Sequence, residues 1–219
     1  MRESFKEKLA ELEQDIFTMG EMVCIATNRA VKALKEHNVN EAKKIKDDDI
    51  YINEKRWAIE EKCINLIATQ QPVATDLREL IAILNIITEL ERMGDYAEGI
   101  AKIAIKIGDE PHVKPLVDIP RMAEIAIEMI NKTLRAYAER DDKTARLICQ
   151  QDDEVDELYT QVYRELLTIM IEDPKTITGA TYLLWASHNI ERIADRVTNI
   201  CERIIFLVTG EMVENVSKY

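Results

Sequence analysis

Apolar residues recur every three or four positions along most of the chain, which is the spacing of amphipathic α-helices. The pattern is interrupted in only five places, and each interruption contains Pro, Gly, Asn or clustered charged residues. These breaks lie near residues 37–40, 70–72, 108–120, 140–142 and 172–174. The pattern therefore predicts six long helices, at roughly 3–36, 40–69, 75–107, 120–139, 142–171 and 176–209.

The composition supports an all-α fold. Among 219 residues there are only six Gly and five Pro, aromatic residues make up 5%, and Ala, Leu, Ile, Glu and Lys are abundant. A helix of thirty residues is about 45 Å long, and rods of this length joined by short connections pack as antiparallel bundles. The hydrophobic content of 47% is enough to fill a sizeable core.

The chain contains an internal duplication. The string ERMGD at Glu91–Asp95 returns as ERIAD at Glu191–Asp195, and the segment that begins at Met19 resembles the segment that begins at Met122. This period is too long for a helical solenoid repeat. We therefore expect two repeated three-helix bundles, at residues 1–109 and 110–219.

Acidic and amide side chains recur at helical i, i+4 spacing in both halves. If the helices on either side of a break are antiparallel, the residue numbers of facing positions have a constant sum. The sum is 144 for Asp49 with Asp95 and for Asn53 with Glu91. It is 347 in the second half, where the facing pairs are Asp152 with Asp195 and Asp156 with Glu191. The register therefore predicts one acidic cluster in each half.

Clustered oxygen ligands point to a hard cation. Four facing carboxylates would repel one another unless a cation neutralised them, and oxygen donors suit Mg, Mn, Ca or iron better than zinc. In each half, the carboxylate pair of the repeated motif (Glu91 and Asp95, or Glu191 and Asp195) lies one residue beyond the apolar stripe of its helix, at the margin between core and solvent. The alternative is salt bridging to nearby Arg and Lys, which would contribute little. The same polar stripes include Glu98 in the first half, and His188 and Asn199 in the second; a lone helical His is more often structural.

Catalysis has no sequence motif to support it. The Glu-x-x-His motif of di-iron bundles is absent, as are the phosphate-binding and nucleophile motifs GxxxxGK[ST], GxGxxG and GxSxG. A carboxylate-ligated metalloenzyme on a helical-bundle scaffold is the alternative function. A plain acidic scaffold that binds no metal is the third reading.

The net charge and the cysteine pattern limit the possible partners and the cellular compartment. A formal net charge of −12 argues against binding to nucleic acid, which requires clustered Lys and Arg. The four cysteines form no CxxC pair, so we expect buried free thiols. No signal peptide or uninterrupted apolar span is evident, so we expect a cytoplasmic protein without membrane insertion.

The break at Pro72 is followed by a predicted helix start. Thr75 or Asp76 is expected to cap this helix, and Asp76 lies too far from Asp95 to share its ion. An exposed Arg78 beside it is a candidate partner surface, together with Asp76.

The strings QQPVATDLREL, ELERMGDYAEGI and the weaker second copy NIERIADRVTNI together resemble the PhoU family of phosphate-signalling regulators. The match spans essentially the whole chain. The resemblance implies two three-helix bundles, with multinuclear iron or other divalent metal clusters held by the acidic motifs. It also implies a non-enzymatic regulator that represses the phosphate-starvation response by contacting the ATPase subunit of the phosphate ABC transporter and a phosphate-sensing histidine kinase. A homodimer is expected.

Carried over to this sequence, the family's metal motifs fall on two sets of residues. The first set is Asp49, Asn53, Glu91 and Asp95, and the second is Asp152, Asp156, Glu191, Asp195 and Asn199. The chain departs from the family pattern at Gly99, where Asn is frequent, and at Arg196, where His is common. It also lacks the DLR string after Pro174, so we expect the two metal sites to differ.

Overall fold

The computed structural model describes residues 2–213, which form six long α-helices as predicted. The helices are α1 (Arg2–Lys35), α2 (Val39–Gln70), α3 (Ala74–Ile107), α4 (Asp118–Glu139), α5 (Asp142–Glu172) and α6 (Ile177–Thr209). One 3₁₀ turn, Pro174–Thr176, precedes α6, and no strand occurs in the described range. The all-α prediction is confirmed.

Local chemistry explains where these helices begin. The side chain of Asn38 accepts a hydrogen bond from the backbone N–H of Glu41 and caps α2. Asp141 caps α5 in the same way, accepting from the backbone N–H groups of Lys143 and Thr144. We predicted that the fourth helix begins at Pro120, but α4 begins at Asp118, because proline in the first turn forfeits no helical hydrogen bond.

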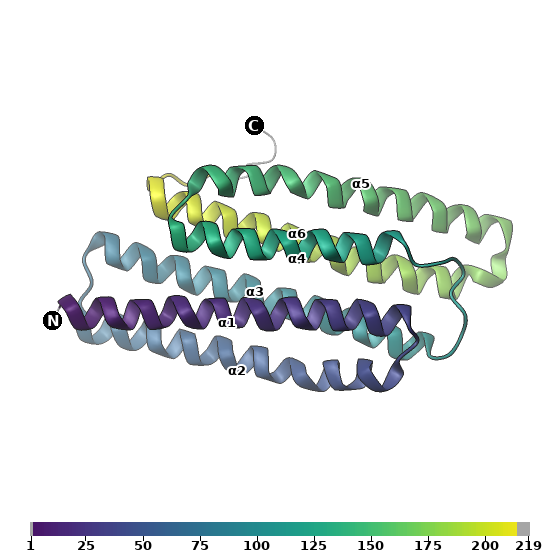
Figure 1. Cartoon of the computed structure of the whole chain (residues 1–219), viewed down its shortest axis with the longest axis horizontal. Helices are drawn as coiled ribbons and strands as arrows, with labels where there is room; N and C mark the ends of the chain where they lie inside the picture. The colour runs from purple at the N-terminus through teal and green to yellow at the C-terminus, as the bar shows by residue number, and fades with distance from the viewer. Residues whose placement is uncertain (1, 214–219) are drawn as a thin grey trace.

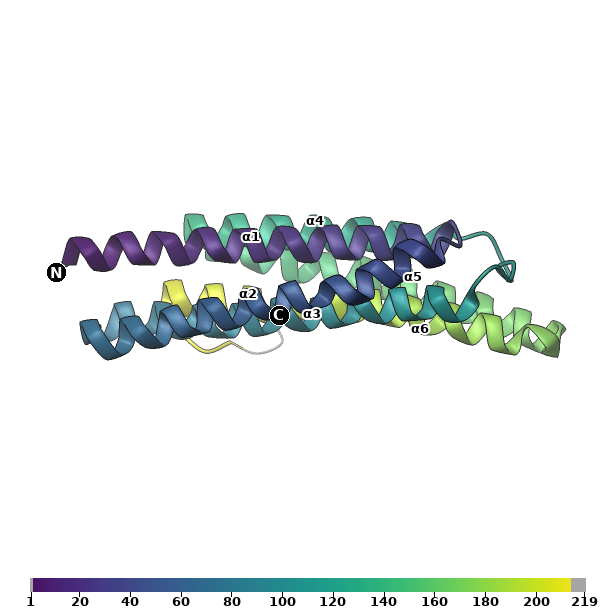
Figure 2. The same ribbon diagram turned by 90° about the horizontal axis from the view of Figure 1, so that it is seen from below.

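The six helices form two antiparallel three-helix bundles that lie side by side (Figure 1). α1, α2 and α3 form one bundle, and α4, α5 and α6 form the other. The turned view places α1 and α4 in one layer and the paired helices α3 and α6 in the other (Figure 2). α2 and α5 flank this pair on opposite edges of the molecule (Figure 1).

α3 and α6 join the two repeats. Asn199 donates a hydrogen bond to Glu89 across this joint at 3.1 Å, and Arg192 hydrogen-bonds to Tyr96. Both pairs have residue numbers that sum to 288, so the two helices are antiparallel in a single register. The apolar stripes predicted for these helices are buried in the shared core. Their members are Ile83, Ile86, Leu90, Met93, Ala97, Ile100 and Ala104 in α3, and Leu183, Ala186, Ile190, Ile193, Val197, Ile200 and Ile204 in α6.

The remaining fold expectations are also met. All four cysteines are buried and free. Within residues 2–213, no helix combines the length and the apolar character that crossing a bilayer requires.

Candidate metal centres

The first acidic cluster lies along the contact between α2 and α3. The side-chain amide of Asn53 donates to Asp49 Oδ2 at 2.9 Å, which fixes the i, i+4 pair on α2. Gly94 permits the close approach of the two helices. A Cβ atom there would lie 3.1 Å from the Ile52 side chain and 3.4 Å from Asp49 Oδ1. The motif glycine therefore helps to bring Asp49 against the acidic face of α3.

The carboxylates of this cluster perturb one another. Partial burial, together with the charges of Glu98 and Asp95, raises the pKa of Asp49 to about 6. Burial and the neighbouring carboxylates also raise the pKa values of Glu91 and Asp95. The interaction of Asp49 with Asp95 agrees with the register that we predicted, and Glu98 joins them as the additional candidate.

Basic neighbours engage part of the first cluster. Arg56 Nε lies 3.9 Å from Glu91 Oε1, and Lys102 Nζ donates to Glu98 Oε2 at 2.6 Å. Glu91 therefore faces a guanidinium of α2, while Asn53, its predicted opposite, is directed to Asp49. The first cluster is partly neutralised by side chains of the protein itself.

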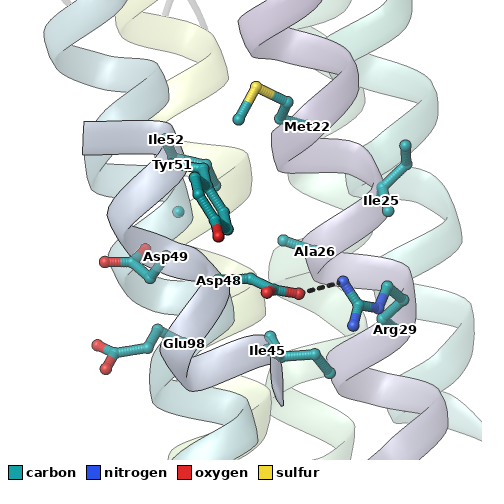
Figure 3. A pocket seen from close by; sticks show the side chains of 11 residues that line it. Met22, Ile25, Ala26, Arg29, Ile45, Asp48, Asp49, Tyr51, Ile52 and Glu98 are labelled. Carbon is teal, nitrogen blue, oxygen red and sulfur yellow. Dashed lines mark hydrogen bonds and ion pairs between the residues drawn. The ribbon is translucent and has the colours of Figure 1, made fainter. Parts of the chain in front are cut away.

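A hollow of about 270 Å³ adjoins this cluster between α1 and α2 (Figure 3). The carboxylates of Asp49 and Glu98 point away from α1, toward the same outer side of α2 (Figure 3). The ion pair of Arg29 with Asp48, at 2.8 Å, spans the gap between the two helices. The hollow separates the first acidic cluster from α1.

The duplication explains this hollow. Ala26 and Gly94 line it, and the duplicated positions in the second half are Met129 and Ala194, both fully buried. The smaller residues in the first half leave unfilled the volume that a methionine side chain fills in the second.

The second acidic cluster lies between α5 and α6 and is more deeply set. Asp152 is only 8% exposed, and its Oδ1 atom is buried without a hydrogen-bond partner among the described residues. Burial, followed by the charges of Asp156, Asp195 and Glu191, raises the pKa of Asp152 to about 7. This is the largest upward pKa shift of any carboxylate in either cluster.

Glu191 and Asp156 of the second cluster also have raised pKa values. Burial and the charge of Asp195 raise the pKa of Glu191 to about 7, and Asp156 adds to the effect. Burial and Asp195 also raise the pKa of Asp156. Asp152 thus interacts with Asp195, and Asp156 with Glu191, the two pairs that the register predicted.

Nearby groups partly offset this charge. Arg192 Nη1 donates to Asp195 Oδ2 at 2.5 Å. His188 Nδ1 lies 3.2 Å from Glu191 Oε2, so His188 stands at the margin of the second cluster, and its side chain is 50% exposed. This contact is the one that places His188, an additional candidate, beside the site.

Asn199 lies elsewhere than we expected. Its side chain donates to Glu89 Oε2 of α3, and Arg196 Nη1 lies 3.4 Å from the same oxygen. The structure thus places Asn199 at the joint between the repeats rather than against the pairs on α5. Glu89 was missed because Asn199 and Arg196 belong to the other repeat, and only the register of α3 against α6 would have revealed their contacts with it.

The two candidates for a partner surface also differ from expectation. α3 begins after Val73 with no side-chain cap, so Asp76 is a first-turn residue that favours the helix dipole and does not cap the helix. Arg78 is half-buried rather than exposed, with its guanidinium 5.5 Å from the centre of the Phe206 ring. Arg78 therefore packs against the end of α6, which accounts for it within the fold.

The donor chemistry of both clusters fits a hard cation. The groups are carboxylate and amide oxygens, and the unpaired Asp152 Oδ1 is a buried acceptor that a cation would satisfy. In the described part of the chain, no three His, Cys, Asp or Glu side chains already converge as a ready site. Glu91, Glu98 and Asp195 are instead turned toward basic neighbours. Metal binding would require these carboxylates to release their ion pairs.

Comparisons with known proteins extend over nearly the whole chain. A family model described as the PhoU domain matches residues 16–104 and 119–204. A Clostridium acetobutylicum protein named phosphate-specific transport system accessory protein PhoU homolog is 39% identical over 214 residues, covering 97% of this chain and 98% of its own length. The Escherichia coli (strain K12) protein named phosphate-specific transport system accessory protein PhoU is 35% identical over 207 residues, covering 94% of this chain and 86% of its own.

Solved structures agree with the sequence comparisons. The crystal structure of PhoU from Pseudomonas aeruginosa superposes with a TM-score of 0.89 at 34% identity, covering 94% of this chain and all of that one. The structure of the phosphate transport system regulatory protein PhoU from Streptococcus pneumoniae also gives a TM-score of 0.89, at 32% identity, covering 96% of this chain and 99% of that one.

Proposed function

Because the chain belongs to the PhoU family, we propose that it is an accessory regulator of phosphate transport that acts through protein contacts in the cytoplasm. The contacts are with the ATPase subunit of the phosphate ABC transporter and with a phosphate-sensing histidine kinase. When phosphate is plentiful, they keep the starvation response off. The single observation that carries the proposal is the full-length match to proteins named for the phosphate-specific transport system.

The proposed role is regulatory rather than enzymatic. The relatives are named as accessory or regulatory proteins, and their names describe no reaction. The conserved architecture and the two acidic clusters support a protein that presents a surface to partners. Turnover of a substrate by the purified, metal-loaded protein would instead support the alternative of a metalloenzyme.

The acidic clusters are the proposed metal sites. Asp49, Asn53, Glu91 and Asp95, with Glu98, would hold a cation on the first bundle. Asp152, Asp156, Glu191 and Asp195, with His188, would hold one on the second. The ion would be iron or another divalent metal, and it would neutralise carboxylates whose pKa values are raised by burial and by mutual repulsion. These side chains would then present a neutral, ordered face to a partner.

Elemental analysis and partner binding test this proposal together. Protein purified without chelator is expected to carry iron, Mn, Mg or Ca, and Glu191→Gln with Asp195→Asn is expected to lower that content. Glu157→Gln with Glu172→Gln is the matched control, because both side chains are exposed carboxylates on α5 that do not raise the pKa values of Asp152, Asp156 or Glu191. Unchanged metal content in the first variant would refute the metal sites.

A pull-down tests the regulatory role. The transporter ATPase and the kinase, each purified with an affinity tag, are expected to retain this protein more strongly at high phosphate than at low phosphate. Light scattering in the same buffers tests the proposed homodimer. Failure to bind either partner at any phosphate concentration would refute the regulatory role, whatever the metal content.

A further inference from the structure

A basic hollow of about 510 Å³ lies where the first turns of α2 meet the last turns of α3. It is lined by Lys43, Lys46, Lys102, Lys106, Asp47 and Ile105. Lys102 is paired with Glu98, so the three remaining lysines against Asp47 give the hollow a local excess of positive charge in a chain whose formal net charge is −12. A local concentration of positive charge on an acidic protein calls for an explanation.

Two of these lysines make no contact that would explain them by the stability of the fold. Lys43 and Lys46 are exposed and make no hydrogen bond or ion pair within the region that the structure describes. Lysines near a helix C-terminus are stabilised by the helix dipole, which accounts for Lys106 in the last turn of α3. Lys43 and Lys46 lie beyond the first turn of α2, where the helix dipole offers them no such stabilisation.

The second repeat shows that the scaffold does not require these lysines. The duplicated positions carry other side chains in the same helical setting, and only one of the four is basic. They are Arg146, Cys149, Glu202 and Phe206. The basic hollow is therefore a feature of the first repeat alone rather than a consequence of the bundle.

Two aromatic side chains of α6 lie beside Lys106, one of the lysines that line the hollow. Lys106 Nζ lies 6.0 Å from the ring centres of both Tyr182 and Trp185 on α6. Trp185 is 49% exposed, so much of its surface is open to a ligand beside the lysines. Clustered ammonium groups bind phosphate oxygens through charge-assisted hydrogen bonds, and an exposed indole can stack on a planar ring.

We propose that this hollow, named here the lysine hollow, binds a phosphate-bearing anion. Lys43 and Lys46 of α2 contact the phosphate oxygens from one side, and Lys106 of α3 contacts them from the other. Trp185 lies where a ring attached to the phosphate would pack. Inorganic phosphates and nucleotides share this chemistry. Trp185 distinguishes the two, because only a nucleotide carries a ring that can stack on its indole. The site does not depend on the proposed function or on metal in the acidic clusters.

Fluorescence titration tests the lysine hollow directly. The chain has two tryptophans, so Trp57→Phe leaves Trp185 as the only indole reporter. Inorganic phosphate and pyrophosphate are titrated by fluorescence, and sulfate at equal ionic strength is the competing anion. Pyrophosphate and ADP are both titrated by calorimetry, so that their affinities can also be compared in the variant that lacks Trp185. We expect saturable binding of a phosphate-bearing probe that sulfate does not reproduce.

Variants assign the binding to the named residues. Lys43→Gln with Lys46→Gln is expected to weaken binding by about tenfold or more, the loss expected when charge-assisted contacts are removed. Lys44→Gln is the matched control, because Lys44 is an exposed lysine on the same turn that lies 3.8 Å from Glu41 and does not line the hollow. All of these side chains are exposed, and thermal melts monitored by circular dichroism verify folding.

The outcomes separate clearly. Tighter binding of ADP than of pyrophosphate, with the difference abolished by Trp185→Leu, supports the proposal with a nucleotide as the source. Equal binding of the two supports it with an inorganic anion as the source. No saturable binding, equal binding of sulfate, or an unchanged affinity in the Lys43/Lys46 double variant overturns it. None of these results bears on the partner pull-down, so the two proposals fail independently.

Discussion

Replacing the buried Asp152 by asparagine should stabilise the metal-free protein. Burial and four neighbouring carboxylates raise the pKa of Asp152 from 3.8 to about 7. A difference of about three pKa units corresponds to roughly 4 kcal/mol of unfavourable free energy for the ionised form, as an upper limit. An asparagine amide removes the charge but leaves a buried polar group, which costs about 1–3 kcal/mol. The expected net gain at pH 8 is therefore about 1–3 kcal/mol.

The pH dependence gives the sign of the effect. Between about pH 4 and pH 7, folded Asp152 keeps its proton while the unfolded chain has lost it. The stability that this group contributes is fully present below the unfolded pKa and is lost as the pH rises through the folded pKa. One proton corresponds to a slope of about −1.4 kcal/mol per pH unit. Asp152→Asn should remove this pH dependence, so the free energy of unfolding of the variant, relative to that of wild type, should grow from pH 5 to pH 8.

Urea unfolding of chelator-treated protein at pH 5, 6, 7 and 8 measures the effect. Glu157→Gln is the control, because this carboxylate of α5 is exposed, is not among the charges that raise the pKa of Asp152, and its loss removes the same formal charge. Added Mn²⁺ should stabilise the wild-type protein by mass action and should stabilise Asp152→Asn much less. Our reasoning would be refuted if the variant were less stable than wild type at pH 8 without metal, or if both variants changed stability equally.

Three further substitutions test the packing described above. Ala26→Met should fill the hollow between α1 and α2 and raise the free energy of unfolding by about 1 kcal/mol, whereas Met129→Ala should lower it by about 2–5 kcal/mol; equal losses in urea titration would contradict the volume argument. Gly94→Val should force α2 away from α3 and lower the free energy of unfolding by about 1–3 kcal/mol. Elemental analysis should then show a loss of metal content. Gly94→Ala should have a smaller effect, because Ala194 occupies the duplicated position. Glu89→Ala should leave Asn199 without its partner across the joint and cost about 1–3 kcal/mol; a thermal melting temperature equal to that of wild type would show that the contact contributes nothing.

The sequence was sufficient to predict which helical segments face each other within each hairpin. The connection between α2 and α3 spans only residues 71–73, so the register of Asp49 against Asp95 follows from counting. The same holds for Asp152 and Asp195, because the break before α6 is short. Periodicity then predicts which residues are buried, and the two apolar stripes confirm it.

Contacts between the repeats were beyond sequence reasoning. Residues 108–117 connect α3 to α4 without regular structure, so counting cannot give the register of α3 against α6. The contact of Asn199 with Glu89 depends on that register. The hollow beside Ala26 likewise depends on the combined volume of side chains from α1, α2 and α3, which periodicity along a single helix does not give. The basic partners of the acidic clusters, such as Arg56, depend on side-chain conformations that periodicity does not specify.

Each acidic cluster is built within one hairpin, and the two clusters have no residue in common. Arg192 nevertheless connects the second cluster to the first repeat, because it contacts Asp195 and hydrogen-bonds to Tyr96 across the joint. Substitutions in the two clusters that leave Arg192 unchanged should therefore have nearly additive effects on unfolding. After the ancestral duplication, either copy was free to change its acidic residues while its twin kept the earlier set.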